Sequence, residues 1–144
     1  MIFAVVITLV VLLCFAVVIA IAKDRGPGPD DVAVSYEMAW DRFDFDVLWT
    51  LSGVELRDGL DRRDFVTAKR AAYANQRALS ELGADVTIED SAARGDAAVV
   101  TTCVALRDGS AVRNEVQLAR RTGRWQVVAY QLATESDPSR HPTE

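Results

Sequence analysis

Apolar residues change their spacing along this chain, and each spacing predicts a different element. From Ile2 to Ala22, twenty of the twenty-one residues are apolar. As a helix, a segment of this length reaches about 30 Å, the thickness of the hydrocarbon core of a bilayer. No basic residue precedes it, as one normally does in a secretory signal, so residues 1–22 are predicted as a transmembrane helix. Ala20-Ile21-Ala22 fits a small-x-small cleavage site, which leaves a cleaved signal as the alternative.

Small residues recur at four-residue steps within the same segment. Because small side chains let helices approach closely in lipid, this series predicts packing against a partner helix. The competing interpretation is that alanine is simply frequent in this chain. The residues of the series are Ala4, Thr8, Ala16 and Ala20.

A short juxtamembrane linker is predicted over residues 23–29. Gly26-Pro27-Gly28-Pro29 does not continue a helix, because proline lacks an amide donor and glycine lowers helical stability. Lys23 and Arg25 follow the apolar segment, whereas only the terminal amine precedes it. The positive-inside rule therefore predicts a single-pass protein of the cell membrane whose following domain is cytoplasmic.

After the linker, apolar positions recur every three or four residues, the period of amphipathic helices. A first helix is predicted over residues 30–42. Asp44 is expected to cap a short second helix that ends near Gly53, and Asp61 a third that fades over residues 76–82. The apolar face of the first helix comprises Val32, Tyr36, Ala39, Trp40 and Phe43.

From Ala84 the period becomes two, and turn signals arrive at regular intervals, so strands replace helices. Loops this short permit only antiparallel neighbours. Three helices followed by such a meander predict an α+β domain over residues 30–133, with the helices covering one face of a curved sheet. The four predicted strands are Asp85–Ala92, Ala97–Arg107, Ala111–Arg121 and Arg124–Ala133.

Turn chemistry also predicts a register for this sheet. A three-residue loop over residues 108–110 would place Val100 opposite Leu118 and make one face nearly all apolar. A two-residue loop would select Val99 and Cys103 for that face instead. Asn114 lies on the buried face in either register. If Arg120 pairs with Arg124 at the last turn, the buried face also gains Gln126, Val128, Tyr130 and Leu132.

Composition removes several classes of function. A net charge of −5 and a pI near 4.9 argue against nucleic-acid binding, which needs a basic face. No Cys-x-x-Cys or His-Glu pair and no phosphate-binding loop is present, so neither a metal nor a cofactor is predicted. Residues 134–144 are polar and proline-containing, which predicts a disordered tail. That tail holds the one histidine of the sequence, His141.

Two segments resemble the nuclear transport factor 2-like (NTF2-like) family. Ala39-Trp40-Asp41-Arg42-Phe43-Asp44-Phe45-Asp46-Val47-Leu48 is similar to the first helix and helical turn of these domains, and Gly123-Arg124-Trp125-Gln126-Val127-Val128-Ala129-Tyr130 to their last strand. The resemblance spans about residues 32–132 and implies a ketosteroid-isomerase-like, cystatin-like α+β cone. Fourteen Arg against two Lys suggest a high-GC actinobacterium, where similar domains occur behind a single membrane helix.

The family resemblance also implies where a catalytic site would lie. Its enzymes use a carboxylate or histidine in the mouth of the cone, and His141 belongs to the tail. Asp41 and Asp44 are near that position, but a solvated helix face and a helix cap explain them better. No catalytic residue is therefore assigned. The residues predicted to line a polar patch in the cone, or else to form a satisfied buried network, are Trp40, Tyr73, Asn114, Gln126 and Tyr130.

These observations favour a non-catalytic, membrane-anchored accessory or scaffold subunit over an enzyme. Its expected partners are the membrane and the subunits of an integral membrane protein complex, with a respiratory-chain supercomplex as one host. A homodimer formed through the sheet is a further expectation. The alternative is a small-ligand-binding domain, or a ketosteroid-isomerase-like or cyclase-like enzyme that uses the cone, because the fold alone does not decide function.

Overall fold

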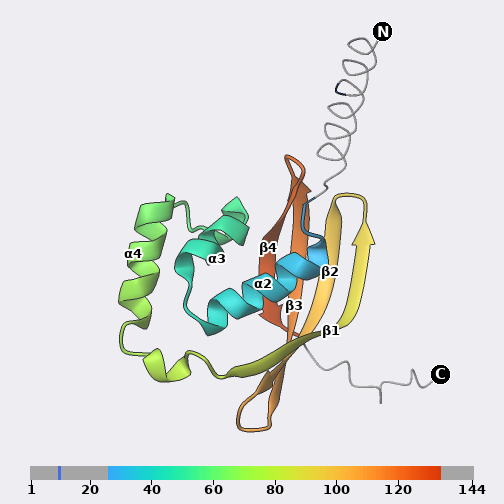
Figure 1. The fold of residues 1–144 in the computed structure, drawn as a ribbon. Helices are drawn as coiled ribbons and strands as arrows, with labels where there is room; N and C mark the ends of the chain where they lie inside the picture. Colours follow the sequence, from blue (N-terminus) through green and yellow to red (C-terminus); the bar gives the residue numbers. More distant parts are fainter. Residues whose placement is uncertain (1–9, 11–25, 134–144) are drawn as a thin grey trace, which may run out of the picture.

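Helices come first in the domain, and polar residues fix where they begin. A computed structural model describes Val10 and residues 26–133 of the chain (Figure 1). The helices are α2 (Pro29–Asp41), α3 (Phe45–Leu51) and α4 (Arg62–Tyr73), with 3₁₀ turns at Val54–Leu56 and Arg77–Leu79.

The two predicted caps are confirmed by hydrogen bonds at the helix starts. Asp44 accepts a hydrogen bond from the Val47 amide at 3.1 Å, and Asp61 accepts one from the Asp64 amide at 2.9 Å. The first helix begins one residue earlier than predicted, at Pro29, because the missing amide of proline is harmless in the first helical turn.

Four antiparallel strands follow in the order in which they occur along the chain. They are β1 (Gly83–Arg94), β2 (Ala97–Leu106), β3 (Ala111–Arg121) and β4 (Arg124–Leu132). In Figure 1, α2 crosses one face of the sheet, and α3 and α4 extend away from it, with α4 outermost. The predicted α+β plan of three helices on a four-stranded antiparallel sheet is therefore confirmed for the described domain.

The predicted β2–β3 register is wrong by two residues, although the predicted buried face is right. Val100 pairs with Val116 rather than Leu118. The Leu106 amide donates to the Ser110 carbonyl at 2.8 Å, so the loop begins one residue earlier than predicted. Gly109, with a φ of 88°, still takes the left-handed position of that loop. Val99 is 40% exposed, which excludes the alternative face.

The β3–β4 register also differs from the prediction. Arg121, rather than Arg120, pairs with Arg124. Thr122 and Gly123 have φ values of 48° and 80°, and two left-handed residues make a turn whose twist matches the strands. Gln126 consequently pairs with Ala119 and lies on the face opposite Val127, not on the buried face.

The core lies between α2 and the sheet. Trp40, on the α2 face predicted to be apolar, is half-buried and packs against it. Leu132 was predicted to be buried but is 70% exposed, at the end of β4. The buried apolar residues are Val32, Ala33, Tyr36, Ala39, Phe45, Leu48, Phe65, Val66, Ala98, Val100, Val116, Leu118 and Val127.

Several predictions concern residues outside the described ones. These are the membrane helix over residues 1–22 with its packing series, the start of the linker and the tail over residues 134–144. Among the helices that the structure describes, none has both the length and the apolar character needed to cross a bilayer.

Candidate functional site

A carboxylate lies in the core of the domain, between α2 and the sheet. Glu37 is 4% exposed. Its Oε1 atom accepts hydrogen bonds from Thr102 Oγ1 at 2.6 Å and from Asn114 Nδ2 at 3.1 Å. Its Oε2 atom accepts one from the Tyr130 hydroxyl at 2.8 Å. We call these four residues the Glu37 cluster.

Each member of the Glu37 cluster comes from a different element. Glu37 follows buried Ala33 by one helical turn of α2, so both face the sheet. Thr102 of β2 and Asn114 of β3 are direct cross-strand partners, which brings their side chains together. Tyr130 of β4 reaches the same face because of a bulge.

That bulge lies where the β3–β4 register shifts, between Gln117 and Leu118. In a regular strand Val127 and Tyr130 would point to opposite faces, because side chains alternate. The extra residue in β4 reverses the alternation, so Val127 pairs with Leu118 and Tyr130 with Val116, two buried residues. The bulge therefore positions the third donor of the cluster.

The electrostatics of the cluster keep its phenol protonated. Burial raises the pKa of Tyr130 above its ordinary value, and the adjacent Glu37 raises it further through its charge and its hydrogen bond. Burial also raises the pKa of Tyr36. The rings of Tyr36 and Tyr130 meet edge-on with centroids 5.3 Å apart. Both phenols act as neutral groups beside a carboxylate acceptor.

The residues predicted to line the cone are placed in three environments. Asn114 and Tyr130 belong to the Glu37 cluster. Trp40 and Tyr73 belong to an aromatic group, with their ring centroids 5.7 Å apart, and the Trp40 indole nitrogen is buried without a hydrogen bond. Gln126 is on the opposite face of its strand from Val127.

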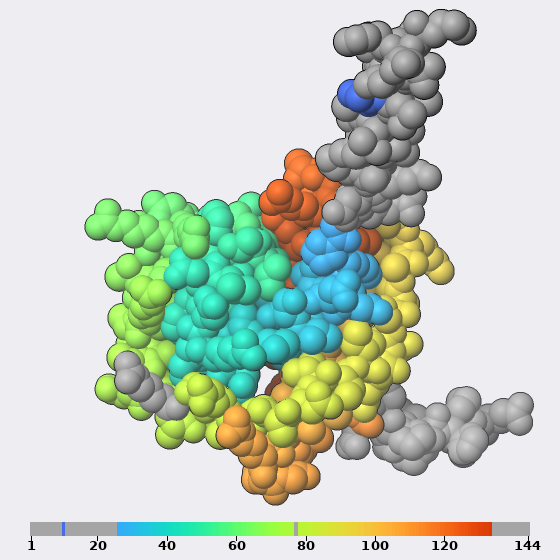
Figure 2. Space-filling view, viewed as in Figure 1, coloured from blue at the N-terminus to red at the C-terminus, as the bar shows by residue number. Residues whose placement is uncertain are grey.

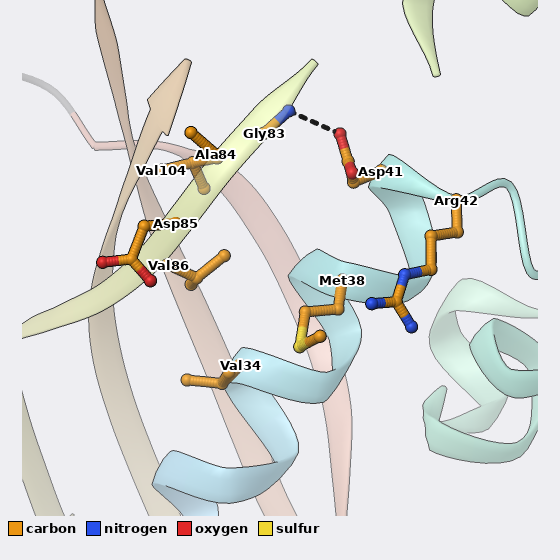
Figure 3. Close-up of a pocket in the computed structure, with 9 residues that line it drawn as sticks. All are labelled: Val34, Met38, Asp41, Arg42, Gly83, Ala84, Asp85, Val86 and Val104. Carbon is orange, nitrogen blue, oxygen red and sulfur yellow. Dashed lines mark hydrogen bonds between the residues drawn. The ribbon is translucent and has the colours of Figure 1, made fainter. Parts of the chain in front are cut away.

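Asp41 and Asp44 do not join the cluster. Asp44 caps α3, as expected from the sequence. Asp41 Oδ1 accepts a hydrogen bond from the Gly83 amide at 2.7 Å (Figure 3), and its carbonyl accepts one from Glu81. Asp41 therefore ties the beginning of β1 to the end of α2. Sequence reasoning named the correct partners, Asn114 and Tyr130, but missed their carboxylate, Glu37.

A pocket of about 220 Å³ lies beside Asp41, between α2 and β1. Figure 2 shows a hollow where the end of α2 (cyan), the start of β1 (yellow-green) and the β2–β3 turn (orange) meet. Apolar side chains from both elements, such as Met38 and Val86, form much of its wall (Figure 3). Its charged residues are Asp41, Arg42 and Asp85. None of the Glu37 cluster lines this pocket.

Neither region has the composition of a metal or nucleophile site. Among the described residues, no three His, Cys, Asp or Glu side chains gather as metal ligands would. Cys103, half-buried, pairs with Thr87 and Arg113 in the sheet. The chemistry available in the core is hydrogen bonding to one carboxylate.

Comparisons with known proteins identify the fold. No family model and no curated protein matches the sequence. A candidate NTF2-like transpeptidase from Campylobacter jejuni is 19% identical with a TM-score of 0.54, over 70% of this chain and 97% of that one. A SEC-C motif-containing protein from Rhodopseudomonas palustris is 20% identical with a TM-score of 0.53, over 74% and 79%. The described domain has an NTF2-like fold, and at these identities the likeness extends to the fold alone.

Proposed function

We propose that this chain is a non-catalytic accessory subunit, anchored in the cell membrane, whose NTF2-like domain docks onto a larger membrane protein complex. The observation that carries the non-catalytic part is the Glu37 cluster, in which a buried carboxylate has hydrogen bonds on both of its oxygens. The apolar N-terminal segment and its short connection to the domain support the membrane location.

A general acid or base must exchange a proton with a bound substrate, so it needs a free and reachable oxygen. Both oxygens of Glu37 already accept hydrogen bonds from side chains of the domain, three in all, and the residue is 4% exposed. Buried polar groups are normally satisfied in this way, and such a network specifies a unique packing. Glu37 therefore acts as a structural link between α2 and three strands.

The proposed anchor would hold the domain close to the bilayer. Only three residues separate Ala22, the last residue of the apolar segment, from Gly26, where the described domain begins. Four fully extended steps span about 14 Å at most. A domain held so closely samples few orientations, which suits docking onto a neighbouring subunit. A respiratory-chain supercomplex is one host, and the exposed face of the sheet is also the proposed surface for a homodimer.

Purification of tagged full-length protein from its own membranes in mild detergent tests this proposal. The matched control is a chain that ends at Pro29 and so carries the apolar segment without the domain. We expect a fixed set of integral membrane subunits to co-migrate with the full chain in native gels, and not with the control. Monomeric migration of the full chain in several mild detergents would contradict the docking role.

A second candidate function is small-ligand binding or ketosteroid-isomerase-like or cyclase-like catalysis. The observation that favours it is the carboxylate itself, since Glu37 accepts a hydrogen bond from Tyr130 in the core between α2 and the sheet. This candidate requires the cluster to open so that a ligand replaces one of the three donors. The name of the Campylobacter jejuni protein includes the word transpeptidase. The domain of this chain contains no histidine that could activate Cys103 as a nucleophile.

A further inference from the structure

A second pocket, of about 540 Å³, lies at the end of the domain that the chain enters from its N-terminus. We call it the entry pocket. Its lining includes Gly26 and Pro27, at the start of the described domain, and Trp49, Arg57, Arg124 and Trp125. In Figure 1 the β1–β2 and β3–β4 turns and the beginning of α2 lie at this same end. The entry pocket therefore opens where the chain leaves toward its apolar segment.

Secondary structure brings the walls of the entry pocket together. The Gly53 amide donates to the Val127 carbonyl at 2.7 Å, which fastens the end of α3 to β4. The α3 segment and the 3₁₀ turn after it contribute Trp49 and Arg57 to the lining, and β4 contributes Arg124 and Trp125. Arg124 directly follows the turn over Thr122 and Gly123 and is exposed.

The two arginines of the entry pocket have no carboxylate partner among the residues that the structure describes. The Arg57 guanidinium lies 3.9 Å from the centre of the Trp49 ring, and its Nε atom is buried without a hydrogen bond. The Trp49 indole nitrogen is likewise buried and unpartnered. Arg121, by contrast, is engaged by Glu55 at 3.0 Å. The stacked Arg57 is held in place, yet its charge is not neutralised.

A guanidinium held on an aromatic ring is well suited to a phosphate, because its fork of N–H donors matches phosphate oxygens. Tryptophan rings, apolar in body with one polar edge, favour the boundary between lipid and water. The pocket combines both in a protein whose net charge is −5. A lining that is cationic and aromatic in an acidic chain indicates an anionic, partly apolar ligand.

We propose that the entry pocket binds the phosphate headgroup of an anionic phospholipid, with Arg57 and Arg124 contacting the phosphate. This inference rests on the membrane location given under the proposed function. The connection of about 14 Å between Ala22 and Gly26 keeps the pocket within reach of the headgroup layer. A bound headgroup would orient the domain by a second contact in addition to its anchor.

Native mass spectrometry of the full-length protein in detergent tests the inference by titration with phosphatidylglycerol and, separately, phosphatidylcholine. The test variant is Arg57→Gln with Arg124→Gln. The control is Arg63→Gln with Arg107→Gln, two exposed arginines outside the pocket whose side chains likewise lack a carboxylate partner in the described part of the chain. We expect phosphatidylglycerol to bind more tightly than phosphatidylcholine, and the test variant to lose about 30-fold in affinity for it. The control should keep the affinity of the unmodified chain.

The outcomes separate this inference from the proposed function. Equal affinity for the two lipids, or an unchanged affinity in the test variant, would overturn the headgroup site. Glycerol 3-phosphate is the soluble probe, and its displacement of the lipid at matched concentration would show a free-phosphate site and overturn the lipid assignment. Carbonate extraction of native membranes tests the anchor separately, since release of the chain would refute the membrane location itself. Arg124→Gln alone, at an exposed position, repeats the test without altering the stacked Trp49.

Discussion

The Glu37 cluster and the entry pocket differ in how their polar side chains are partnered. In the core, one carboxylate receives three hydrogen bonds from three strands. At the entry pocket, Arg57 and Trp49 each bury a nitrogen that has no partner. Polar groups that are satisfied internally stabilise a fold, whereas unsatisfied ones retain the capacity to bind something else. This difference supports the structural role proposed for the Glu37 cluster and the binding role proposed for the entry pocket.

The largest effect should come from Glu37→Leu. This change leaves Thr102, Asn114 and Tyr130 without their shared acceptor in the core. Buried donors without an acceptor destabilise the folded state. We expect the free energy of unfolding to fall by about 3–5 kcal/mol. Urea unfolding of the full-length protein in mild detergent, followed by tryptophan fluorescence, measures it.

Asp85→Leu is the matched control, because Asp85 is an exposed carboxylate in the first pocket. Its free energy of unfolding should change by less than about 0.5 kcal/mol. If Glu37→Leu proves as mild as this control, the cluster is not structural. The second candidate function would then gain support, because a buried carboxylate that does not stabilise the fold is better explained by ligand binding or catalysis.

A smaller loss is expected from Tyr130→Phe, which removes one of the three donors and keeps the aromatic ring. A hydrogen bond to a charged group contributes about 1.5–3 kcal/mol, and the free energy of unfolding should fall by that amount. Tyr73→Phe is the control, because Tyr73 packs in the aromatic group outside the cluster. Equal effects of the two substitutions would contradict the assigned role of the Tyr130 hydroxyl.

Alkaline pH should weaken the fold through the same phenols. The pKa values of Tyr36 and Tyr130 are raised in the folded protein, while an unfolded tyrosine ionises near pH 10. Above about pH 10 the unfolded state therefore binds fewer protons than the folded state, and stability falls as pH rises. Between its unfolded and folded pKa values, each tyrosine contributes a slope of at most about 1.4 kcal/mol per pH unit.

Unfolding measured at a series of pH values, with tyrosinate absorbance as the second readout, checks this linkage. Tyr130→Phe should reduce the fall in the free energy of unfolding with rising pH by the contribution of one tyrosine. Tyrosinate absorbance from Tyr36 and Tyr130 should rise together with unfolding and not before it. An unchanged slope in the variant would show that Tyr130 ionises freely in the folded protein.

The sequence predicts the elements of this fold well because their signals are local. The helix caps at Asp44 and Asp61 act within three residues. The alternation of apolar and polar residues along a strand directly predicts which side chains are buried. The β2–β3 register is predicted two residues out, because a loop that begins at Arg107 or at Asp108 satisfies the same pattern of glycine and apolar residues.

The site is harder to predict than the fold, because it joins distant parts of the chain. Glu37 and Tyr130 are far apart in sequence, and the β4 bulge that brings Tyr130 inward has no local sequence signal. One signal was available: Thr102, Asn114 and Tyr130 were all predicted on the buried face, and buried donors need an acceptor. An acidic residue one turn after Ala33 on the covering helix could have supplied it. The entry pocket had no such signal, since it forms only where β4 meets α3.

The smallest effect on stability should come from the entry pocket, where Arg57→Gln with Arg124→Gln tests the other side of the comparison. Stacking of Arg57 on Trp49 stabilises the fold by about 0.5–1 kcal/mol. Removing a guanidinium whose Nε is buried without a partner stabilises the fold by a similar amount, so the two effects offset each other. We therefore expect the free energy of unfolding in detergent to change by less than about 0.5 kcal/mol. The same variant is expected to lose most of its preference for anionic lipid, so binding and stability would separate. A loss of stability as large as that of Glu37→Leu would mean that the arginines hold the domain together, and the contrast between a structural core and a binding end would no longer stand.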